Sequence, residues 1–312
     1  MWMDERSDTL TLIFVNNSGA FEFLLKPFNI SIQPRPYLAS LCFTDQTTSP
    51  AQPRVPCPRS ISTAMGQEGS KPMPTTDTAL PGRDDTMAVS ATHYILQNNT
   101  VPPFADHLET CVFGTGCFWG TEKGFWRLPG VKATSVGYCN GITKNPTYQE
   151  VCSGRTGHNE VVQVVWDPSE ITFGDILRQF WQSHDPTQGM GQGNDRGTQY
   201  RSGIYPTSAT QQEIAGKTKI AYQEALSGTG KTITTEIVDA NSALFYYAED
   251  YHQQYLAKPG ANQYCSAQPL SISLPAVEGV KFLLPETYWE KHAPTPHCVL
   301  RQSNEQISLS SL

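Results

Sequence analysis

Apolar side chains recur with two different spacings along the second part of this chain, between residues 108 and 266. Alternating or continuous apolar runs indicate strands, whereas apolar positions three and four apart indicate helices. The pattern predicts, in order, a strand over 111–113, a helix over 118–128, strands over 131–138 and 160–166, a helix over 171–181, a strand over 201–205, a helix over 209–226, a strand over 233–238 and a helix over 246–256. This alternation predicts an α+β or α/β sandwich of about 160 residues that ends near Ser266.

The region before residue 108 has a different composition. From about Thr44 to Asp106, Ser, Thr, Pro, Gly and Gln dominate without a sustained period. Such a stretch buries too little apolar surface to offset the entropy lost on ordering, so we expect a disordered linker. Residues 9–43 alternate weakly and are compatible with two strands. The chain is therefore divided into a largely disordered N-terminal extension (1–107), a folded domain (108–268) and a C-terminal tail (269–312).

Charge and cysteine content limit the partners and compartments. With 22 Lys and Arg against 29 Asp and Glu, the formal charge is −7, which argues against nucleic acid as a partner. No apolar run approaches the roughly 20 residues that span a bilayer, so a soluble protein is expected. Eight scattered cysteines favour a reducing compartment over a disulfide scaffold or zinc site. Early acidic residues argue against a signal peptide, and we expect a cytoplasmic protein, with mitochondria as the alternative.

Cys117 differs from the other cysteines in its position. It follows a glycine-rich turn and opens a predicted helix, where free N–H groups and the helix dipole should lower the pKa of its thiol. Such a thiolate is a nucleophile, although a cysteine can also be simply a small buried residue. The adjacent Phe118 and Trp119 form either an apolar wall for a methyl group or part of the core. The long polar segments 139–159 and 184–200 are predicted to be functional loops.

Residues 116–120, Gly-Cys-Phe-Trp-Gly, resemble the active-site motif of the methionine sulfoxide reductase A family. Further motifs extend the resemblance in order over about residues 110–265: Gly137-Tyr138, Asn145–Tyr148, Glu150–Gly154, Thr156–His158, Glu160, His184–Gln188, Gln192–Ser202, Ile233–Ile237 and Phe245–Leu256. The resemblance implies an α+β fold, a ferredoxin-like two-layer sandwich of a mixed, mainly antiparallel sheet with helices. It also implies reduction of the S-epimer of methionine sulfoxide, free or in proteins, and thus repair of oxidised proteins.

The resemblance implies a role for each matching residue. The Cys117 thiolate attacks the sulfoxide sulfur, and Glu160 protonates the departing oxygen. Glu160 lies where a polar loop meets an apolar strand, so partial burial would keep it protonated near neutral pH, and a solvated glutamate is the plainer alternative. Tyr148 and Tyr200 match tyrosines that hydrogen-bond the sulfoxide oxygen, and Asp195 matches a residue that helps to shape the site. The aromatic pair after the nucleophile then holds the substrate methyl group.

The oxidised nucleophile must be recycled. Attack leaves Cys117 as a sulfenic acid, which condenses with a second thiol. The resemblance places this resolving thiol at Cys265 and implies that thioredoxin, or dithiothreitol in vitro, reduces the disulfide. No bound cofactor, no metal and a monomeric state are expected. The usual second cysteine soon after the resolving one is absent, the next thiol is Cys298, and whether it joins the recycling stays open.

Two rival hypotheses and one misleading motif accompany this interpretation. One rival is acyl transfer by Cys117 with His158 or His184 as the base, which would not need Cys265. The other is an inactive redox-sensing or interaction module. Residues 225–232 resemble a phosphate-binding loop, but that motif requires a strand before it and a helix after it, the reverse of the predicted order.

Overall fold

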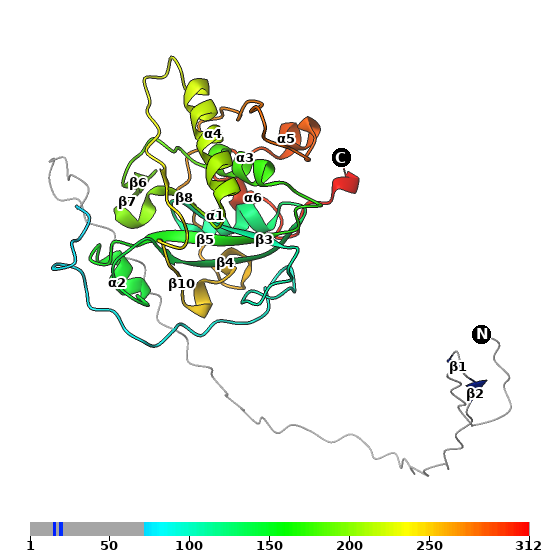
Figure 1. The fold of residues 1–312 in the computed structure, drawn as a ribbon, viewed down its shortest axis with the longest axis horizontal. Coiled ribbons are helices and arrows are strands. Elements are labelled where there is room, and N and C mark those ends of the chain that lie inside the picture. Colours follow the sequence, from blue (N-terminus) through cyan, green and yellow to red (C-terminus); the bar gives the residue numbers. More distant parts are fainter. Residues whose placement is uncertain (1–14, 17–18, 21–71, 312) are drawn as a thin grey trace, which may run out of the picture. The chain divides into compact units, whose positions relative to one another are not determined.

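The computed structural model describes residues 15–16, 19–20 and 72–311, and the chain divides into two units. The first unit, Met1–Arg54, contains an antiparallel pair of two-residue strands, β1 (Val15–Asn16) and β2 (Gly19–Ala20). The second unit, Val55–Leu312, contains all other described elements (Figure 1). The remainder of the two strands expected in the first unit lies outside the described residues.

A six-stranded mixed sheet forms the centre of the second unit, in the order β10-β4-β5-β3-β8-β9. Neighbouring strands are antiparallel except for β8 and β9, which run parallel. The strands are β3 (Glu109–Thr115), β4 (Val131–Cys139), β5 (Asn159–Trp166), β8 (Ser202–Pro206), β9 (Glu236–Ile237) and β10 (Phe245–Tyr247). The prediction of a mixed, mainly antiparallel sheet is confirmed.

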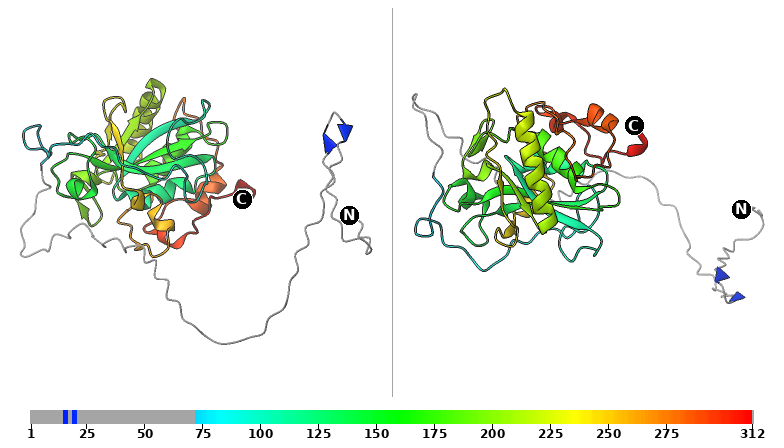
Figure 2. Two further views of the ribbon diagram at one scale, coloured as in Figure 1. Left: turned by 90° about the horizontal axis from the view of Figure 1, so that it is seen from below. Right: turned by 45° about the horizontal axis from the view of Figure 1, so that its top comes forward.

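Three helices pack against this sheet: α1 (Phe118–Trp126), α3 (Phe173–Ser183) and α4 (Ala209–Ala225), the last of which crosses in front of the strands in the right-hand view of Figure 2. With the shorter elements left aside, the first two of these helices and the strands next to them follow along the chain in the order β3-α1-β4-β5-α3-β8. The ferredoxin-like description of this sandwich stays a prediction. The remaining elements are α2 (Tyr148–Cys152), the hairpin β6 (Gly191–Gln192) and β7 (Asp195–Arg196), α5 (Glu286–His292), α6 (Cys298–Arg301) and the 3-10 turns η1 (Thr198–Tyr200), η2 (Asp250–His252), η3 (Tyr255–Ala257) and η4 (Leu309–Ser311).

The apolar core follows the alternation of the strands. In β5, Val162, Val164 and Trp166 belong to the main cluster with the helices, whereas Val161 belongs to a smaller second cluster. Successive strand residues point to opposite faces, so apolar side chains cover both sides of the sheet. β5 is buried except for the half-buried Gln163, and it pairs with β3 and β4 on its two sides. Its first residues, which are polar, are therefore held in place near the glycine turn after β3.

The helix predicted over 246–256 is wrong. Its first residues form β10 on the edge of the sheet, where Tyr246 pairs with Tyr138 of β4, and two 3-10 turns follow. The Gln253 side chain accepts from the N–H of Val136 and donates to its C=O, each at 2.9 Å, so a side-chain amide continues the strand ladder. Gln254 then adopts a left-handed backbone with φ 46°, which a helix does not permit.

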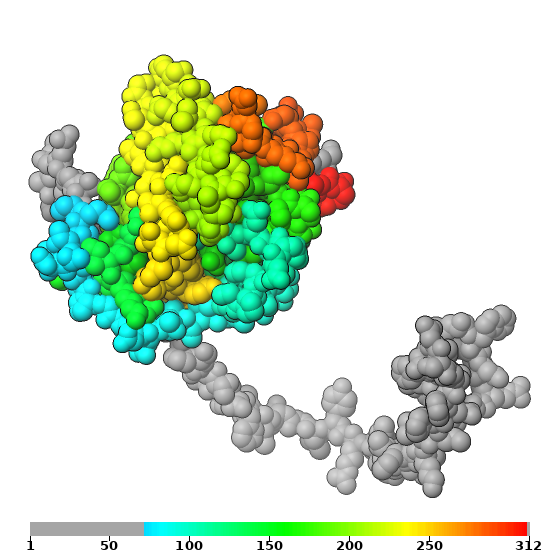
Figure 3. All heavy atoms as spheres, in the orientation of Figure 1, coloured from blue at the N-terminus to red at the C-terminus, as the bar shows by residue number. Residues whose placement is uncertain are grey.

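The disordered linker predicted up to residue 106 is also wrong for its second part, residues 72–106. This segment has little regular secondary structure, but it runs along the rim of the domain and is coloured cyan in Figure 3. Arg83 pairs with Glu150 at 2.6 Å, and the fully buried His93 hydrogen-bonds Thr134 of β4 at 2.9 Å. Polar anchors of this kind give no hydrophobic period, so composition alone did not reveal them.

The C-terminal tail packs on the domain as far as Ile307, whose backbone N–H donates to the Arg127 carbonyl at 2.9 Å. Arg178 of α3 forms an ion pair with Glu286 at 2.6 Å and lies over the Trp289 ring, 4.8 Å from its centroid. Trp126 of α1 donates its indole N–H to the Asn304 carbonyl at 2.9 Å. These contacts cover the outer side of α1 and α3. Among the described residues, no helix is both long and apolar enough to cross a membrane.

Candidate active site

Cys117 lies at the strand-to-helix corner that the sequence predicts. β3 ends at Thr115, α1 begins at Phe118, and Cys117 is the residue that precedes the helix. Gly116 has φ +100°, and a Cβ on it would lie 2.7 Å from the Gln192 side chain, so only glycine fits. The turn before Cys117 thus lies against the loop that contains Gln192.

The expected lowering of the Cys117 pKa is wrong. The pKa of this thiol lies well above its usual value, because burial disfavours the thiolate and the carboxyl groups of Glu160 and Asp195 add to the effect. The backbone N–H of Trp119 favours the thiolate but does not outweigh these terms. The site at rest therefore holds a Cys117 thiol that keeps its proton.

Glu160 is a buried residue at the start of β5, where it lies opposite Tyr138 of β4. Only 1% of it is exposed, so the alternative of a solvated glutamate is wrong. Its Oε2 accepts a hydrogen bond from the backbone N–H of Phe118 at 3.2 Å. The carboxyl group therefore lies at the N-terminus of α1, one residue from Cys117.

Three other predicted residues converge on the same place. Tyr148 begins α2, Asp195 begins β7 and Tyr200 ends the η1 turn. The pKa of the Tyr200 hydroxyl is raised by burial and, in addition, by charge on Glu160, Tyr148, Cys117 and Asp195. Charges act appreciably on one another only over short distances. The two polar loops thus bring their tyrosines and aspartate to the Cys117 thiol.

Aromatic rings form one wall of the site. Phe118 is 1% exposed and stacks on Tyr148 with centroids 6.5 Å apart, while the half-buried Trp119 stacks on Tyr255 at 4.1 Å. His252 contacts this group and accepts a hydrogen bond from the Trp119 indole N–H. The sequence assigns no individual function to Tyr255 and His252. The motif over 245–256, which contains both, is the sequence signal that points to them.

Cys265 lies beside the first turn of α1. A Cβ on Gly120 would be 2.9 Å from the Cys265 sulfur, so the glycine makes room for this thiol. Gly120 follows Cys117 by three residues, a spacing that places two positions next to each other on a helix surface. Burial raises the pKa of Cys265 to about 11. Cys298 lines the same small cavity, which lies between α1 and the C-terminal segment.

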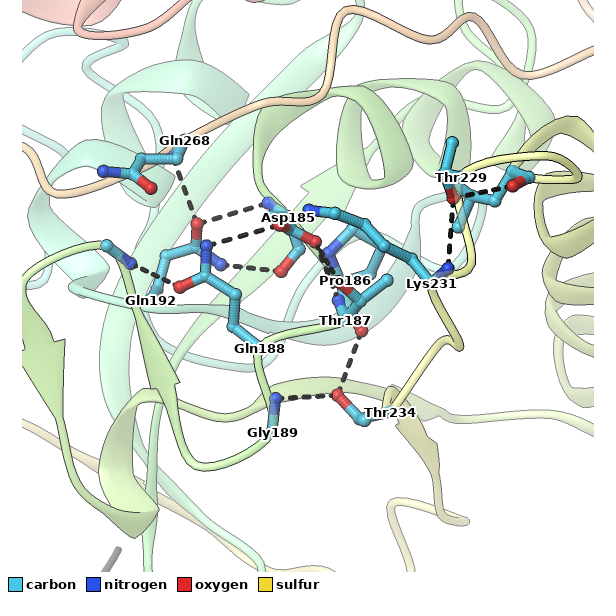
Figure 4. Close-up of polar contacts among 12 residues, drawn as sticks. Asp185, Pro186, Thr187, Gln188, Gly189, Gln192, Thr229, Lys231, Thr234 and Gln268 are labelled. Carbon is cyan, nitrogen blue, oxygen red and sulfur yellow. Dashed lines mark hydrogen bonds and ion pairs between the residues drawn. The ribbon is translucent and has the colours of Figure 1, made fainter. Parts of the chain in front are cut away.

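The chain around Cys265 is attached to the β6–β7 hairpin at two points. The Tyr264 hydroxyl donates to Asp195 Oδ1 at 2.7 Å, and the Gln268 N–H donates to Gln192 Oε1 at 3.1 Å. Gln192 also exchanges hydrogen bonds with the Asp185 backbone, as Figure 4 shows. One hairpin therefore carries Asp195 and also supports the segment that contains Cys265.

Lys231, from the phosphate-loop-like segment, has a structural partner. Its Nζ pairs with Asp185 Oδ2 at 2.6 Å (Figure 4). Burial would raise the Asp185 pKa, but hydrogen bonds from Lys231 and Thr187 outweigh it and lower that pKa. The segment follows α4 and precedes β9, which confirms its interpretation as a helix-to-strand turn.

The two histidines of the acyl-transfer hypothesis make other contacts. His184 contacts the Phe180 carbonyl with Nδ1 at 2.9 Å and the Ser202 hydroxyl with Nε2 at 2.7 Å. His158 directs Nε2 at the Thr143 carbonyl at 2.7 Å. Burial lowers the pKa of each histidine to about 4. Both are therefore bound within the fold and are poor candidates for a general base.

Comparison with known proteins agrees with this geometry. Residues 109–278 match the family model described as peptide methionine sulfoxide reductase. The chain belongs to the peptide methionine sulfoxide reductase family. The reductase MsrA of Rippkaea orientalis is 57% identical over 204 residues, which cover 65% of this chain and 93% of that protein. The mitochondrial reductase of Rattus norvegicus is 52% identical over 212 residues, covering 68% and 89%.

A solved structure of the same family has a similar fold. Methionine sulfoxide reductase A of Corynebacterium diphtheriae aligns with a TM-score of 0.59 and 40% identity over 66% of this chain and 100% of that one. The resemblance inferred from the motifs is thus confirmed, and this peptide methionine sulfoxide reductase is an oxidoreductase that reduces methionine sulfoxide. The chain after residue 278, including α5 and α6, lies outside the family match.

Proposed function

We propose that this reductase acts on the S-epimer of methionine sulfoxide, with Cys117 as the nucleophile and Glu160 as the acid. The observation that carries the proposal is their shared position at the start of α1, where Glu160 accepts the N–H of Phe118, the residue after the nucleophile. A sulfoxide oxygen is a poor leaving group until it is protonated. Tyr148 and Tyr200 hydrogen-bond that oxygen, Asp195 shapes the site, and the rings of Phe118 and Trp119 hold the methyl group.

The first step balances without a further reagent. Cys117 sulfur attacks the sulfoxide sulfur, the sulfoxide S–O bond breaks, and the oxygen is transferred to Cys117. Methionine sulfur gains two electrons and Cys117 sulfur loses two. The thiol proton, passed through Glu160, ends on the transferred oxygen. The products are methionine and a Cys117 sulfenic acid.

The second step uses the thiol that lies beside α1. Cys265 attacks the Cys117 sulfenic acid, water leaves, and an intramolecular disulfide forms. Thioredoxin, or dithiothreitol in vitro, then reduces this disulfide by thiol exchange. The close approach of the Cys265 sulfur to Gly120, one turn from Cys117, supports this pairing.

The chemistry is tested by incubating the protein with each epimer of a methionine sulfoxide peptide and dithiothreitol. The native protein should release methionine from the S-epimer only, and Cys117→Ser should release none. Cys152→Ser, which alters a half-buried thiol outside the proposed cycle, is the matched control and should retain activity. Activity in Cys117→Ser, or a preference for the R-epimer, would contradict the proposal.

We further propose that residues 108–268 are the catalytic domain of a monomer that works in a reducing compartment, the cytoplasm or, alternatively, mitochondria. The free thiols of all six cysteines in the part of the chain that the structure describes support such a compartment. Light scattering during size-exclusion chromatography gives the mass directly. A particle of twice the mass of the chain would contradict the monomer.

A further inference from the structure

His252 lies in the middle of the aromatic wall, although the reaction described above gives it no task. It is 2% exposed, and its ring centroid lies 4.5 Å from that of Tyr148, 5.1 Å from Phe118 and 5.7 Å from Trp119. All three neighbours are proposed substrate residues. A buried polar ring in such a group requires a specific hydrogen bond.

The hydrogen bond that His252 makes has a defined direction. Trp119 Nε1 and His252 Nδ1 are 3.0 Å apart, and an indole nitrogen can only donate. Nδ1 is therefore an unprotonated acceptor. Burial lowers the pKa of His252 to about 3, so the ring stays neutral at physiological pH with its proton on Nε2. The acceptor for the indole is available across the working pH range.

This bond restricts the motion of Trp119 that stacking leaves free. Tyr255 covers one face of the indole at a centroid distance of 4.1 Å and an interplanar angle of 22°. Stacked rings can still slide and rotate in their plane, whereas a hydrogen bond at the ring edge fixes that rotation. Gln254, between the two, donates its N–H and its side-chain amide to Glu122 of α1 at 2.8 and 2.7 Å. Residues 252–255, which contact the indole, are thus hydrogen-bonded to α1, the helix that contains Trp119.

The same segment also holds Tyr148, another member of the aromatic wall. Glu249 Oε1 accepts the backbone N–H of Tyr148 at 2.8 Å, and Oε2 accepts the Tyr138 hydroxyl at 2.9 Å. Residues 249–255 therefore hold both Tyr148 and Trp119 in place within the aromatic wall.

We propose that His252 is a positioning residue that fixes the Trp119 indole, so that the pocket accepts a methyl group on the sulfoxide sulfur and disfavours a larger alkyl group. This inference rests on the proposed function of Phe118 and Trp119 as the methyl-binding wall. Loss of the Nδ1 acceptor leaves the indole N–H of the half-buried Trp119 without its partner, and the ring must then turn or shift. The pocket would widen while the thiol and its acid stay in place.

The test compares two substrates in matched variants. The S-epimers of methionine sulfoxide and ethionine sulfoxide differ by one methylene on the sulfur, and a fixed apolar pocket discriminates such a pair by about 10-fold or more in kcat/KM. In His252→Leu, KM for methionine sulfoxide should rise about 10-fold with little change in kcat, and the preference for methyl over ethyl should largely disappear. His252→Asn places an oxygen near the position of Nδ1 and should restore both values.

Controls separate positioning from stability and from the chemistry itself. His107→Leu alters a histidine whose side chain is 65% exposed, and it should leave both substrates unaffected. If His252→Leu does not fold, His252→Gln takes its place, because its side-chain oxygen lies one bond further out than Nδ1. This variant should also lose the preference for methyl over ethyl on the sulfoxide sulfur. A folded His252→Leu or His252→Gln with native KM and native preference would overturn the inference. A native protein that releases no methionine would instead overturn the proposed function.

Discussion

A shift from pH 8 to pH 5 should destabilise this protein strongly, because four of its histidines are buried in the neutral form. Burial lowers the pKa of His93 and His252 to about 3 and that of His158 and His184 to about 4. In the unfolded chain each returns to about 6.5. A group with a folded pKa below its unfolded value takes up its proton first in the unfolded chain. The stability it contributes is therefore complete above about pH 6.5 and is lost as the pH falls.

The size of the loss follows from these pKa values. At pH 5 each of the four histidines favours the unfolded chain by about 2 kcal/mol relative to pH 8. Glu122 acts in the opposite direction, because burial raises its pKa to about 7 and its contribution to stability grows by about 2.5 kcal/mol as the pH falls over the same range. The net loss is about 5.5 kcal/mol, which compares with a total stability of about 5–15 kcal/mol for an ordinary domain.

The assay is urea unfolding followed by tryptophan fluorescence at pH 8 and pH 5. His93 provides a matched variant, because its Nδ1 accepts the N–H groups of Ile95 and Leu96 at 3.1 and 3.0 Å. His93→Asn keeps an acceptor near that position and cannot titrate, so the difference between the two pH values should shrink by about 2 kcal/mol. Equal free energies of unfolding at pH 8 and pH 5 for the native chain would refute the reasoning.

Three further predictions concern the site. Glu160→Gln should lower kcat by about 10²–10⁴-fold with a smaller change in KM, because it removes the proposed proton donor. Steady-state kinetics on the S-epimer measure both constants, and a native kcat in this variant would contradict the role of Glu160. Cys265→Ser should release about one methionine per enzyme in a single turnover and then fail with thioredoxin; sustained thioredoxin turnover counts against its role. Gly120→Ala places a Cβ 2.9 Å from the Cys265 sulfur. It should slow disulfide formation, measured by thiol trapping, while the first methionine is released at the native rate.

Strong periodicity predicted the parts of the fold that build the main core. The helix after Cys117 and the valine-rich strand ending at Trp166 were placed correctly, because their side chains are buried by their own regular pattern. The segment over 246–256 failed for the opposite reason. Its order comes from single side-chain hydrogen bonds, such as the Gln253 amide on Val136, and these depend on a partner more than a hundred residues away. The spacing of apolar residues along the sequence cannot predict such a bond.

The candidate site likewise contains residues that local motifs identify and residues that only the folded structure identifies. The motifs predicted Cys117, Glu160 and the two tyrosines as site residues, and the fold brings these residues together. The sequence does not show the positioning role proposed for His252, because its hydrogen-bond partner is an indole 133 residues earlier in the chain. The predicted lowering of the Cys117 pKa is wrong for a related reason. A helix N-terminus, which favours the thiolate, is a local feature of the sequence, whereas the burial and the two carboxyl groups that disfavour the thiolate come from distant segments.

The raised pKa of Cys117 fits the proposed chemistry better than the lowered pKa that the sequence predicts. A thiolate is the better nucleophile, but the oxygen that leaves a sulfoxide must also receive a proton. Burial raises the pKa of Cys117, and the Glu160 carboxyl group adds to the effect. A permanent thiolate at Cys117 would bring no proton of its own to the proposed reaction. In that reaction, the burial that opposes the thiolate keeps in the site the proton that completes the transfer of oxygen.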